Sequence, residues 1–208
     1  MNLDINHKTK LNNLVIKTKT TSIKPTFLVE EKNRFDALCR ESCKNYQNKW
    51  SCPPFSPGFV QYSNKHDTLV VCLMYIELGQ LNNIKNDYLK VKAANVIMKS
   101  KVDKGLRKIA LIENGKLIST GSCRLCKPCR MRYEEPCRHP DIMGYSFEAL
   151  GIDVGKLSLE VFNHKLLWYK KGYLPKYTSV VAGVLLNSEL TDEKLQKCLF
   201  EELQQNNV

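Results

Sequence analysis

The sequence predicts an α+β fold, in which a mostly antiparallel sheet carries one long helix and has cysteine-rich loops at one side. Two strand-length runs, Thr68–Leu78 and Tyr177–Leu186, are rich in Val, Leu and Ile. Between them, apolar residues recur at helical spacing over Leu81–Leu106. Seven of the nine cysteines fall into two compact groups. We therefore expect an ordinary apolar core beside a separate cysteine-rich part.

The first 24 residues are polar and rich in Lys, Thr and Asn, with few apolar side chains. Segments of this composition bury too little apolar surface to offset the entropy cost of folding. We expect residues 1–24 to be a mobile N-terminal segment with one edge strand at Asn13–Thr18. Residues 25–208 are long enough for a proper core and are expected to form a single α+β domain.

Two elements are expected before the first long strand. The apolar spacing over Val29–Cys39 predicts a short helix that delivers Cys39 to the cysteine-rich part. Residues 43–59 interrupt regular structure with three prolines and a glycine, namely Pro53, Pro54, Pro57 and Gly58. We expect this stretch to be a loop wrapped around a bound metal group, which would supply the core that the loop lacks.

The long helix presents lysines on one face, and Gly105 lies near its expected end. Beyond it, Ile109–Ile112 and Lys116–Ile118 flank Asn114-Gly115, a pair typical of type I′ turns. The sequence therefore predicts a β-hairpin at this point. The hairpin would lead directly into the second group of cysteines.

The last third of the chain predicts more strands and a final helix. Apolar residues after Val154 indicate a helix or an irregular cover, and His164–Tyr169 resembles a strand before Tyr177–Leu186. Thr191 is a candidate N-cap for the final helix. Four residues are spaced to share one apolar face of that helix: Leu195, Cys198, Leu199 and Leu203.

The downstream cysteine group has the spacing of a metal-cluster motif. Cys123, Cys126 and Cys129 are two residues apart, and Cys137 follows after seven more. Three cysteines at this spacing curl the backbone so that their sulfur atoms converge, as in the Cys-x2-Cys-x2-Cys run of ferredoxins. Cys137 comes later than the fourth cysteine of ferredoxins, so the similarity is one of kind.

The upstream group contains Cys39, Cys43 and Cys52, and Pro53 follows its last cysteine directly, as in ferredoxins. Disulfide pairing and unligated thiols are the alternatives to metal binding for both groups. Cys72 and Cys198 stand alone in apolar stretches, so we expect them to be core or contact residues. The predicted metal ligands are Cys39, Cys43, Cys52, Cys123, Cys126, Cys129 and Cys137.

Iron–sulfur and zinc are the two metal chemistries that these thiols suit. Structural zinc sites usually use two Cys-x2–4-Cys pairs, whereas three closely spaced cysteines suit three corners of a cubic cluster. We therefore predict one or two [4Fe-4S] clusters, with zinc as the alternative. Two cubes have eight irons for seven thiols, so one iron would be held by His139, another side chain, water or a substrate.

Several short words of the sequence occur together in a known family. They are Trp50-Ser-Cys52-Pro-Pro, the Cys123–Cys129 triplet, Cys137-Arg-His-Pro140 and Ser146-x-Glu-Ala-x-Gly-Ile-Asp-Val154. The chain resembles, from about Cys39 to Leu186, the family of predicted metal-binding proteins called domain of unknown function 2284. The resemblance implies an iron–sulfur or other metal site and implies no known reaction. It departs from the usual pattern at Gly144-Tyr145 and Phe147, which leaves the cysteines unaffected.

The formal net charge of +11 comes mainly from lysines that are spread along the chain, as on a solvated surface. We therefore disfavour nucleic acid as a partner. Four of the seven arginines lie in the downstream cysteine segment. Three of them are candidates to hold a small anionic substrate: Arg124, Arg130 and Arg138. Neither an apolar signal region nor a run near the ~20 residues of a membrane span is present, so we expect a cytoplasmic protein without paired disulfides.

No phosphate-binding glycine loop and no nucleophile elbow is present in the sequence. His7 is expected to be solvated, and His66 and His164 to be surface or core residues. Glu148 and Asp153 are expected to cap or anchor local structure, with substrate or proton handling as the alternative. The sequence favours a redox role, either electron transfer to a partner protein or a cluster-based enzyme with an open iron site. A zinc-stabilised module that binds protein or nucleic acid is the alternative, and whether the protein is an enzyme stays open.

Overall fold

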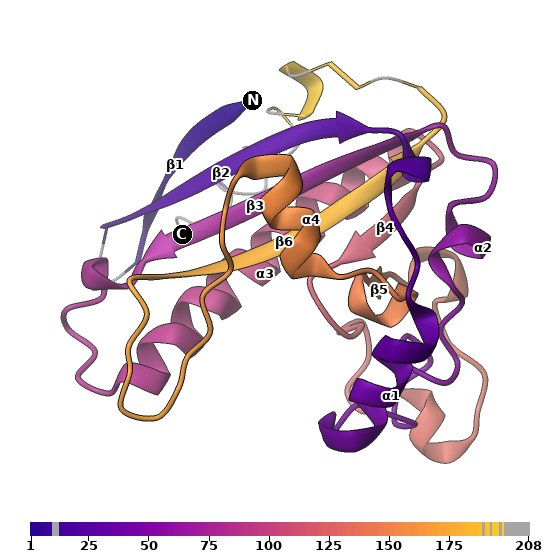
Figure 1. The fold of residues 1–208 in the computed structure, drawn as a ribbon, viewed down its shortest axis with the longest axis horizontal. Helices are drawn as coiled ribbons and strands as arrows, with labels where there is room; N and C mark the ends of the chain where they lie inside the picture. Colours follow the sequence, from indigo (N-terminus) through magenta and orange to yellow (C-terminus); the bar gives the residue numbers. More distant parts are fainter. Residues whose placement is uncertain (10–12, 189, 192, 196, 198–208) are drawn as a thin grey trace.

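The computed structural model describes residues 1–9, 13–188, 190–191, 193–195 and 197. A six-stranded sheet in the order β1-β2-β3-β6-β4-β5 runs through it (Figure 1). Neighbouring strands are antiparallel except for β4 and β5, which are parallel. The predicted α+β class with a mostly antiparallel sheet is therefore confirmed. The strands are β1 (Asn2–Lys8), β2 (Asn13–Ile23), β3 (Thr68–Glu77), β4 (Lys116–Ser119), β5 (Tyr145–Ser146) and β6 (Tyr177–Leu186).

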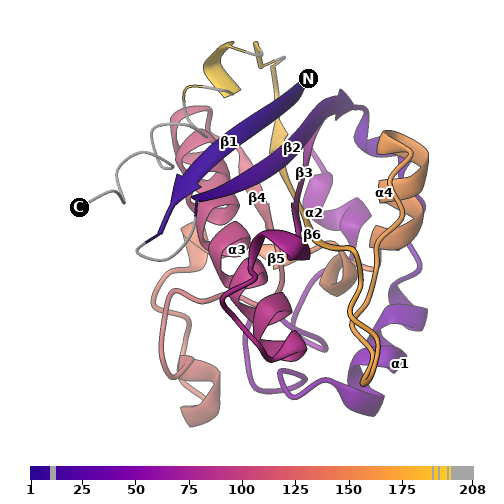
Figure 2. The same cartoon turned by 90° about the vertical axis from the view of Figure 1, so that its left-hand side faces the viewer.

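Helices cover both faces of the sheet (Figures 1 and 2). Four are α-helices: α1 (Lys32–Ser42), α2 (Phe59–Ser63), α3 (Asp87–Ile112) and α4 (Val154–Phe162). Five short 3-10 helices join the other elements: η1 (Pro25–Phe27), η2 (Leu78–Gln80), η3 (Arg130–Tyr133), η4 (Pro140–Ile142) and η5 (Glu148–Leu150). Among the helices of the described residues, none has both the length and the apolar character that crossing a bilayer requires.

The core lies on both sides of the central strands β3 and β6. On one face, α3 buries residues such as Met98 and Leu106 against alternate residues of β2, β3 and β6. On the other face, Phe59 of α2, Leu150 of η5 and Leu157 of α4 pack against the remaining alternate residues. Because both faces are covered, most residues of β3 and β6 are buried. This explains why the two strands are the most continuous apolar runs in the sequence.

The N-terminal residues take a larger part in the sheet than their composition predicts. β2 pairs with β1 on one side and with β3 on the other, so it is not the predicted edge strand. Its alternate residues Leu14, Ile16, Thr18 and Thr20 are buried, and the threonines favour strand geometry. Residues expected to be mobile therefore include two strands, while the division of the chain at residue 24 stays a prediction.

The predicted hairpin at residues 109–118 is wrong in its first half, because α3 continues to Ile112. Ile109 and Ala110 are buried and join the face of the helix that packs on the sheet. Asn114 has a positive φ of 51°, and the N–H of Gly115 donates to the carbonyl of Ala110 (2.7 Å). Asn114-Gly115 therefore terminates a helix by a Schellman-type bond instead of turning a hairpin. β4 begins at Lys116, as predicted.

Other boundaries also differ from the sequence prediction. α3 begins at Asp87 instead of Leu81, because Asn86 caps it by accepting from the N–H of Leu89 (3.0 Å). Residues 164–169 are irregular and pair with no strand of the sheet. Thr191 accepts from the N–H of Lys194 (3.3 Å), as a cap would. The predicted positions of Cys198, Leu199 and Leu203 in the final helix lie outside the described residues.

Candidate metal-binding segments

The upstream cysteines lie on the end of α1 and on the turn structure that follows it. Cys39 is in the last turn of α1, and the N–H of Cys43 closes that turn by donating to the Cys39 carbonyl (3.0 Å). The chain then folds back, so that the N–H of Gln47 donates to the carbonyl of Pro53 (3.0 Å). Burial raises the pKa of the Cys52 thiol to about 11, and the nearby Cys43 and Cys39 add to the increase. The end of α1 and the loop that folds back after it thus carry all three upstream cysteines.

α1 is held in place by the segment Ser146–Val154. The N–H of Glu31 donates to the carbonyl of Gly151 (2.7 Å), directly before α1 begins. Gly151 has a φ of +87°, and a β-carbon there would lie 2.7 Å from the Cα of Lys32. The hydroxyl of Ser56 also donates to the carbonyl of Ala149 (2.8 Å), which fixes the proline-rich loop to the same segment. The segment therefore serves as the support for the upstream cysteines.

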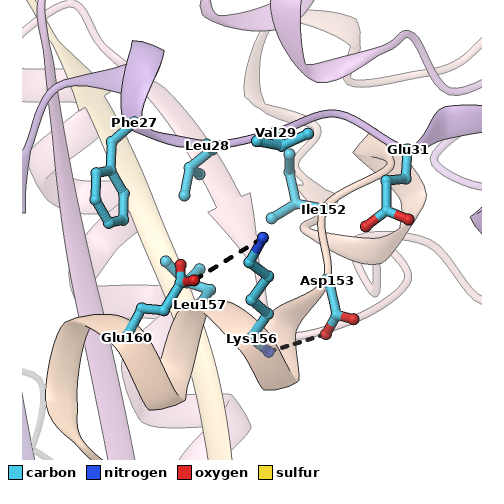
Figure 3. A pocket seen from close by; sticks show the side chains of 9 residues that line it. All are labelled: Phe27, Leu28, Val29, Glu31, Ile152, Asp153, Lys156, Leu157 and Glu160. Carbon is cyan, nitrogen blue, oxygen red and sulfur yellow. Dashed lines mark hydrogen bonds and ion pairs between the residues drawn. The ribbon is translucent and has the colours of Figure 1, made fainter.

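Asp153 ends this support by capping α4. Its carboxylate accepts from the N–H groups of Gly155 (2.9 Å) and Lys156 (3.0 Å), so the expected capping role is confirmed. Figure 3 shows Lys156 between Asp153 and Glu160, facing the segment Phe27–Val29. The space enclosed there is about 30 Å³, roughly one water molecule. This region is a packing joint between α4 and the entry to α1, and it offers no room for a ligand.

The downstream cysteines follow β4 and are held by bonds to α3 and within their own loop. Asp103 of α3 accepts from the N–H of Thr120 (2.9 Å) and pairs with Arg124 at 2.5 Å. Arg130 forms an ion pair with Glu135. The backbone N–H of His139, rather than its side chain, donates to the sulfur of Cys137 (3.4 Å). Two of the three arginines expected to hold a substrate are thus already paired with carboxylates.

Four hydrogen bonds join the two cysteine segments directly, and one of them runs from Lys49 to the hydroxyl of Ser122 (3.1 Å). The hydroxyl of Ser51, which is buried, accepts from the N–H of Cys123 (2.9 Å). Lys49 donates to the carbonyl of the same cysteine (2.8 Å), and the indole of Trp50 donates to the carbonyl of Glu135 (2.9 Å). In Figures 1 and 2, α1 and η3 accordingly lie at the same end of the molecule, below the sheet. Sequence reasoning gave no role to Lys49 and Ser51, although both lie between Cys43 and Cys52 and Ser51 belongs to the family word Trp50-Ser-Cys52.

The eight cysteines of the described residues are free thiols. Within the described residues, no three side chains of His, Cys, Asp or Glu are arranged so that they would hold one metal ion. The fit to a metal therefore rests on the donor set, since thiols are ligands for both iron–sulfur clusters and zinc. The assignment of seven cysteines as ligands stays a prediction. Cys72 lies apart in β3 with no exposed surface, as expected of a core residue.

Two of the described histidines, His164 and His7, are at least partly buried against or within the sheet. His164 is buried, donates to or accepts from Ser179 (2.9 Å), and packs against Tyr75 and Tyr177, which fits the expected core role. His7 lies half-buried in β1, and its Nδ1 atom is buried. The expectation that His7 is solvated is therefore wrong, because β1 belongs to the sheet. Burial lowers the pKa of both imidazoles.

Comparison with known proteins gives one match. A family model described as "Predicted metal-binding protein (DUF2284)" matches residues 22–186. This range contains both cysteine segments, their support at Ser146–Val154 and the strands β3 to β6. The chain matches no curated protein and no solved structure.

Proposed function

Because this chain belongs to the DUF2284 family of predicted metal-binding proteins, we propose that its two cysteine segments bind iron–sulfur and give the protein a redox role. The observation that carries the proposal is the direct joining of the segments by Ser51 and Lys49 at Cys123. The two segments that carry the seven thiols are thereby joined, through contacts between residues 72 and 74 positions apart in the sequence. Thiol donors in this number suit one or two [4Fe-4S] clusters.

The roles of the residues follow from their positions. Cys123, Cys126, Cys129 and Cys137 would hold one cluster, and Cys39, Cys43 and Cys52 would supply three ligands of a second. A bound cluster of this type supplies one-electron transfer. The N–H of His139 already donates to a sulfur atom, and such bonds stabilise the negative charge on thiolate ligands. Lys49 places a positive charge next to Cys123, which has the same effect.

The upstream group has three thiols, one fewer than the four ligand positions of a [4Fe-4S] cluster. What fills the fourth position distinguishes two kinds of redox protein. If another side chain completes the set, the protein is an electron carrier that needs a redox partner protein, most simply in the cytoplasm. If the fourth position is left to water or substrate, the protein is a cluster-based enzyme. Zinc is the alternative metal, because four thiolates also satisfy its tetrahedral preference. A zinc-bound chain would be a binding module for protein, or less readily for nucleic acid.

The experiment is visible absorption and electron paramagnetic resonance (EPR) of protein that has been purified without oxygen. We expect a brown protein whose broad absorption near 400 nm is bleached by dithionite, with an EPR signal that appears on reduction. A Cys123→Ser/Cys126→Ser double variant should lose most of the absorption. A colourless protein that carries zinc after expression with ample iron would contradict the proposal and would favour the binding module.

A further inference from the structure

A cavity large enough for a small molecule lies next to the cysteine segments. It occupies about 340 Å³ between α3, β6 and the irregular segment 166–169. A second hollow of about 470 Å³ continues along α3 and shares Tyr88, Val91, Asn95 and Lys99 with the first. Sites for small molecules typically measure about 300–1,000 Å³. The two hollows thus form one groove of suitable size along the helix.

The walls of this groove are largely apolar and aromatic. Val91 lies on α3, Val181 on β6, and Leu166 on the irregular segment that completes the wall. Trp168 and Tyr88 stand at the opening with 66% and 54% of their surfaces exposed. A tryptophan with two thirds of its surface in water is costly in apolar exposure unless something else covers it. These side chains would accept an aromatic or branched apolar body.

Lys99 of α3 supplies a positive charge within the groove. It is half-buried, and its ammonium group makes no hydrogen bond or ion pair with the described part of the chain. Burial and the nearby Arg124 lower its pKa, while Glu148 and Asp103 act in the opposite direction. Arg124 is itself satisfied by Asp103. Of the two lysines that line the groove, Lys92 is exposed and Lys99 is half-buried, so Lys99 is the one whose charge a bound anion would complement best.

We propose that this groove binds a small organic anion that carries a single negative charge and an aromatic or branched apolar body. Lys99 would hold the anionic group, with Asn95 and Thr120 as neighbouring polar groups, and Trp168 would cover the apolar body. Glu148 also lines the groove, and its negative charge opposes any ligand with several charges. The inference goes beyond the proposed function, because it holds whichever metal the cysteines bind.

The groove also adjoins both cysteine segments. Arg124, on its rim, directly follows Cys123 in the chain, and the charge of Glu148 acts on Cys39. The bound anion would therefore lie beside the thiols that are proposed to hold metal. The sequence had pointed to Arg124, Arg130 and Arg138 for an anion, and it gave no reason to single out Lys99 among the lysines of a long helix.

The test is saturation-transfer NMR on the full chain as purified, with two amphipathic monoanions as probes, phenyllactate and 8-anilinonaphthalene-1-sulfonate. We expect at least one to bind, and Lys99→Met to weaken that binding about tenfold, as loss of a charged hydrogen bond predicts. Lys104→Met is the matched control, since Lys104 is exposed on the same helix and does not line the groove, and it should bind the probe normally.

Trp168→Ala provides a second variant. Removing an exposed side chain should leave the fold intact and should weaken binding of the probe several-fold. Thermal unfolding of each variant shows whether it is folded. The inference is overturned if neither probe binds, if Lys99→Met and Lys104→Met bind the probe equally, or if pyrophosphate displaces it at lower concentration than the monoanions. Since the measurement follows ligand binding alone, it gives the same answer with zinc-bound or iron-bound protein.

Discussion

Cys72 and Cys126 carry the same thiol in opposite surroundings. Cys72 has no exposed surface, and burial raises its pKa to about 12. It lies in β3, where its side chain packs with the core beneath α3. Cys126 is half-buried on a loop, with two residues between it and each of two other cysteines. A thiol in the first setting is a small apolar side chain, whereas one in the second is free to become a metal ligand.

We therefore predict that Cys126→Ala lowers the iron content and also the stability of the folded protein, because ligation and folding are coupled. Cys72→Ala should keep its iron and lose only about 1–2 kcal/mol of unfolding free energy for the smaller buried side chain. Both are measured by iron analysis and urea unfolding. Full iron in Cys126→Ala, or loss of iron from a folded Cys72→Ala, would show that the ligands are assigned wrongly.

Asp153 allows a test of its structural role at a single residue. Asp153→Ala should lower the unfolding free energy by about 1 kcal/mol, because two N–H groups at the start of α4 lose their acceptor. Asp153→Asn should remain near the wild type, since Asn caps equally well and the 3.7 Å ion pair to exposed Arg34 contributes little. If Asn were as harmful as Ala, the carboxylate charge would matter more than the cap.

At the scale of elements, the docking of α1 on Gly151 decides where the upstream cysteines lie. Gly172 and Gly151 both have a positive φ, +81° and +87°. Replacing either glycine by alanine should lower the unfolding free energy by about 1–2 kcal/mol, because alanine adopts that backbone conformation less readily. A β-carbon at Gly172 meets nothing within 4 Å, whereas one at Gly151 meets the backbone of Lys32 at 2.7 Å. The clash should add about 1–3 kcal/mol at Gly151.

Urea unfolding of the two variants measures this difference in stability. Their metal content shows whether the change at Gly151 also affects metal binding by the upstream cysteines. We expect Gly151→Ala to be the less stable of the two and to bind less metal, since it displaces the helix that carries Cys39. Equal losses of stability and of metal in both variants would mean that α1 does not depend on this contact.

The sequence predicted elements best where burial itself sets the pattern. Both long strands are found within one residue of their predicted bounds, because nearly continuous apolar runs mark strands covered on both faces. The prediction of a strand at Ile109–Ile112 was wrong, because β-branched residues followed by Asn114-Gly115 fit a hairpin as well as the end of a helix. Packing of Ile109 against the sheet decides between them, and that contact is invisible to local pattern. β1 was missed because its residues are mostly polar.

For the whole molecule, the spacing of the cysteines predicted the two groups, but it did not predict that the two segments contact each other. The bonds from Ser51 and Lys49 to Cys123 connect residues 72 and 74 positions apart. Such contacts depend on how α1, the proline-rich loop and the end of β4 are placed by the sheet. The same holds for the groove at Lys99, which is lined by several residues each of α3, β6 and the segment 166–169. Local pattern therefore selected the candidate cysteines, and the tertiary fold joins the two segments that carry them.

The proposal that the thiols of the two cysteine segments hold an iron–sulfur cluster is tested most directly by measuring iron, zinc and acid-labile sulfide in protein purified without oxygen. We predict iron and sulfide in nearly equal amounts, about four or about eight of each per chain, with little zinc. About eight would mean that both segments hold a cluster and that one iron lacks a cysteine. Zinc at about one or two per chain without sulfide would contradict the claim.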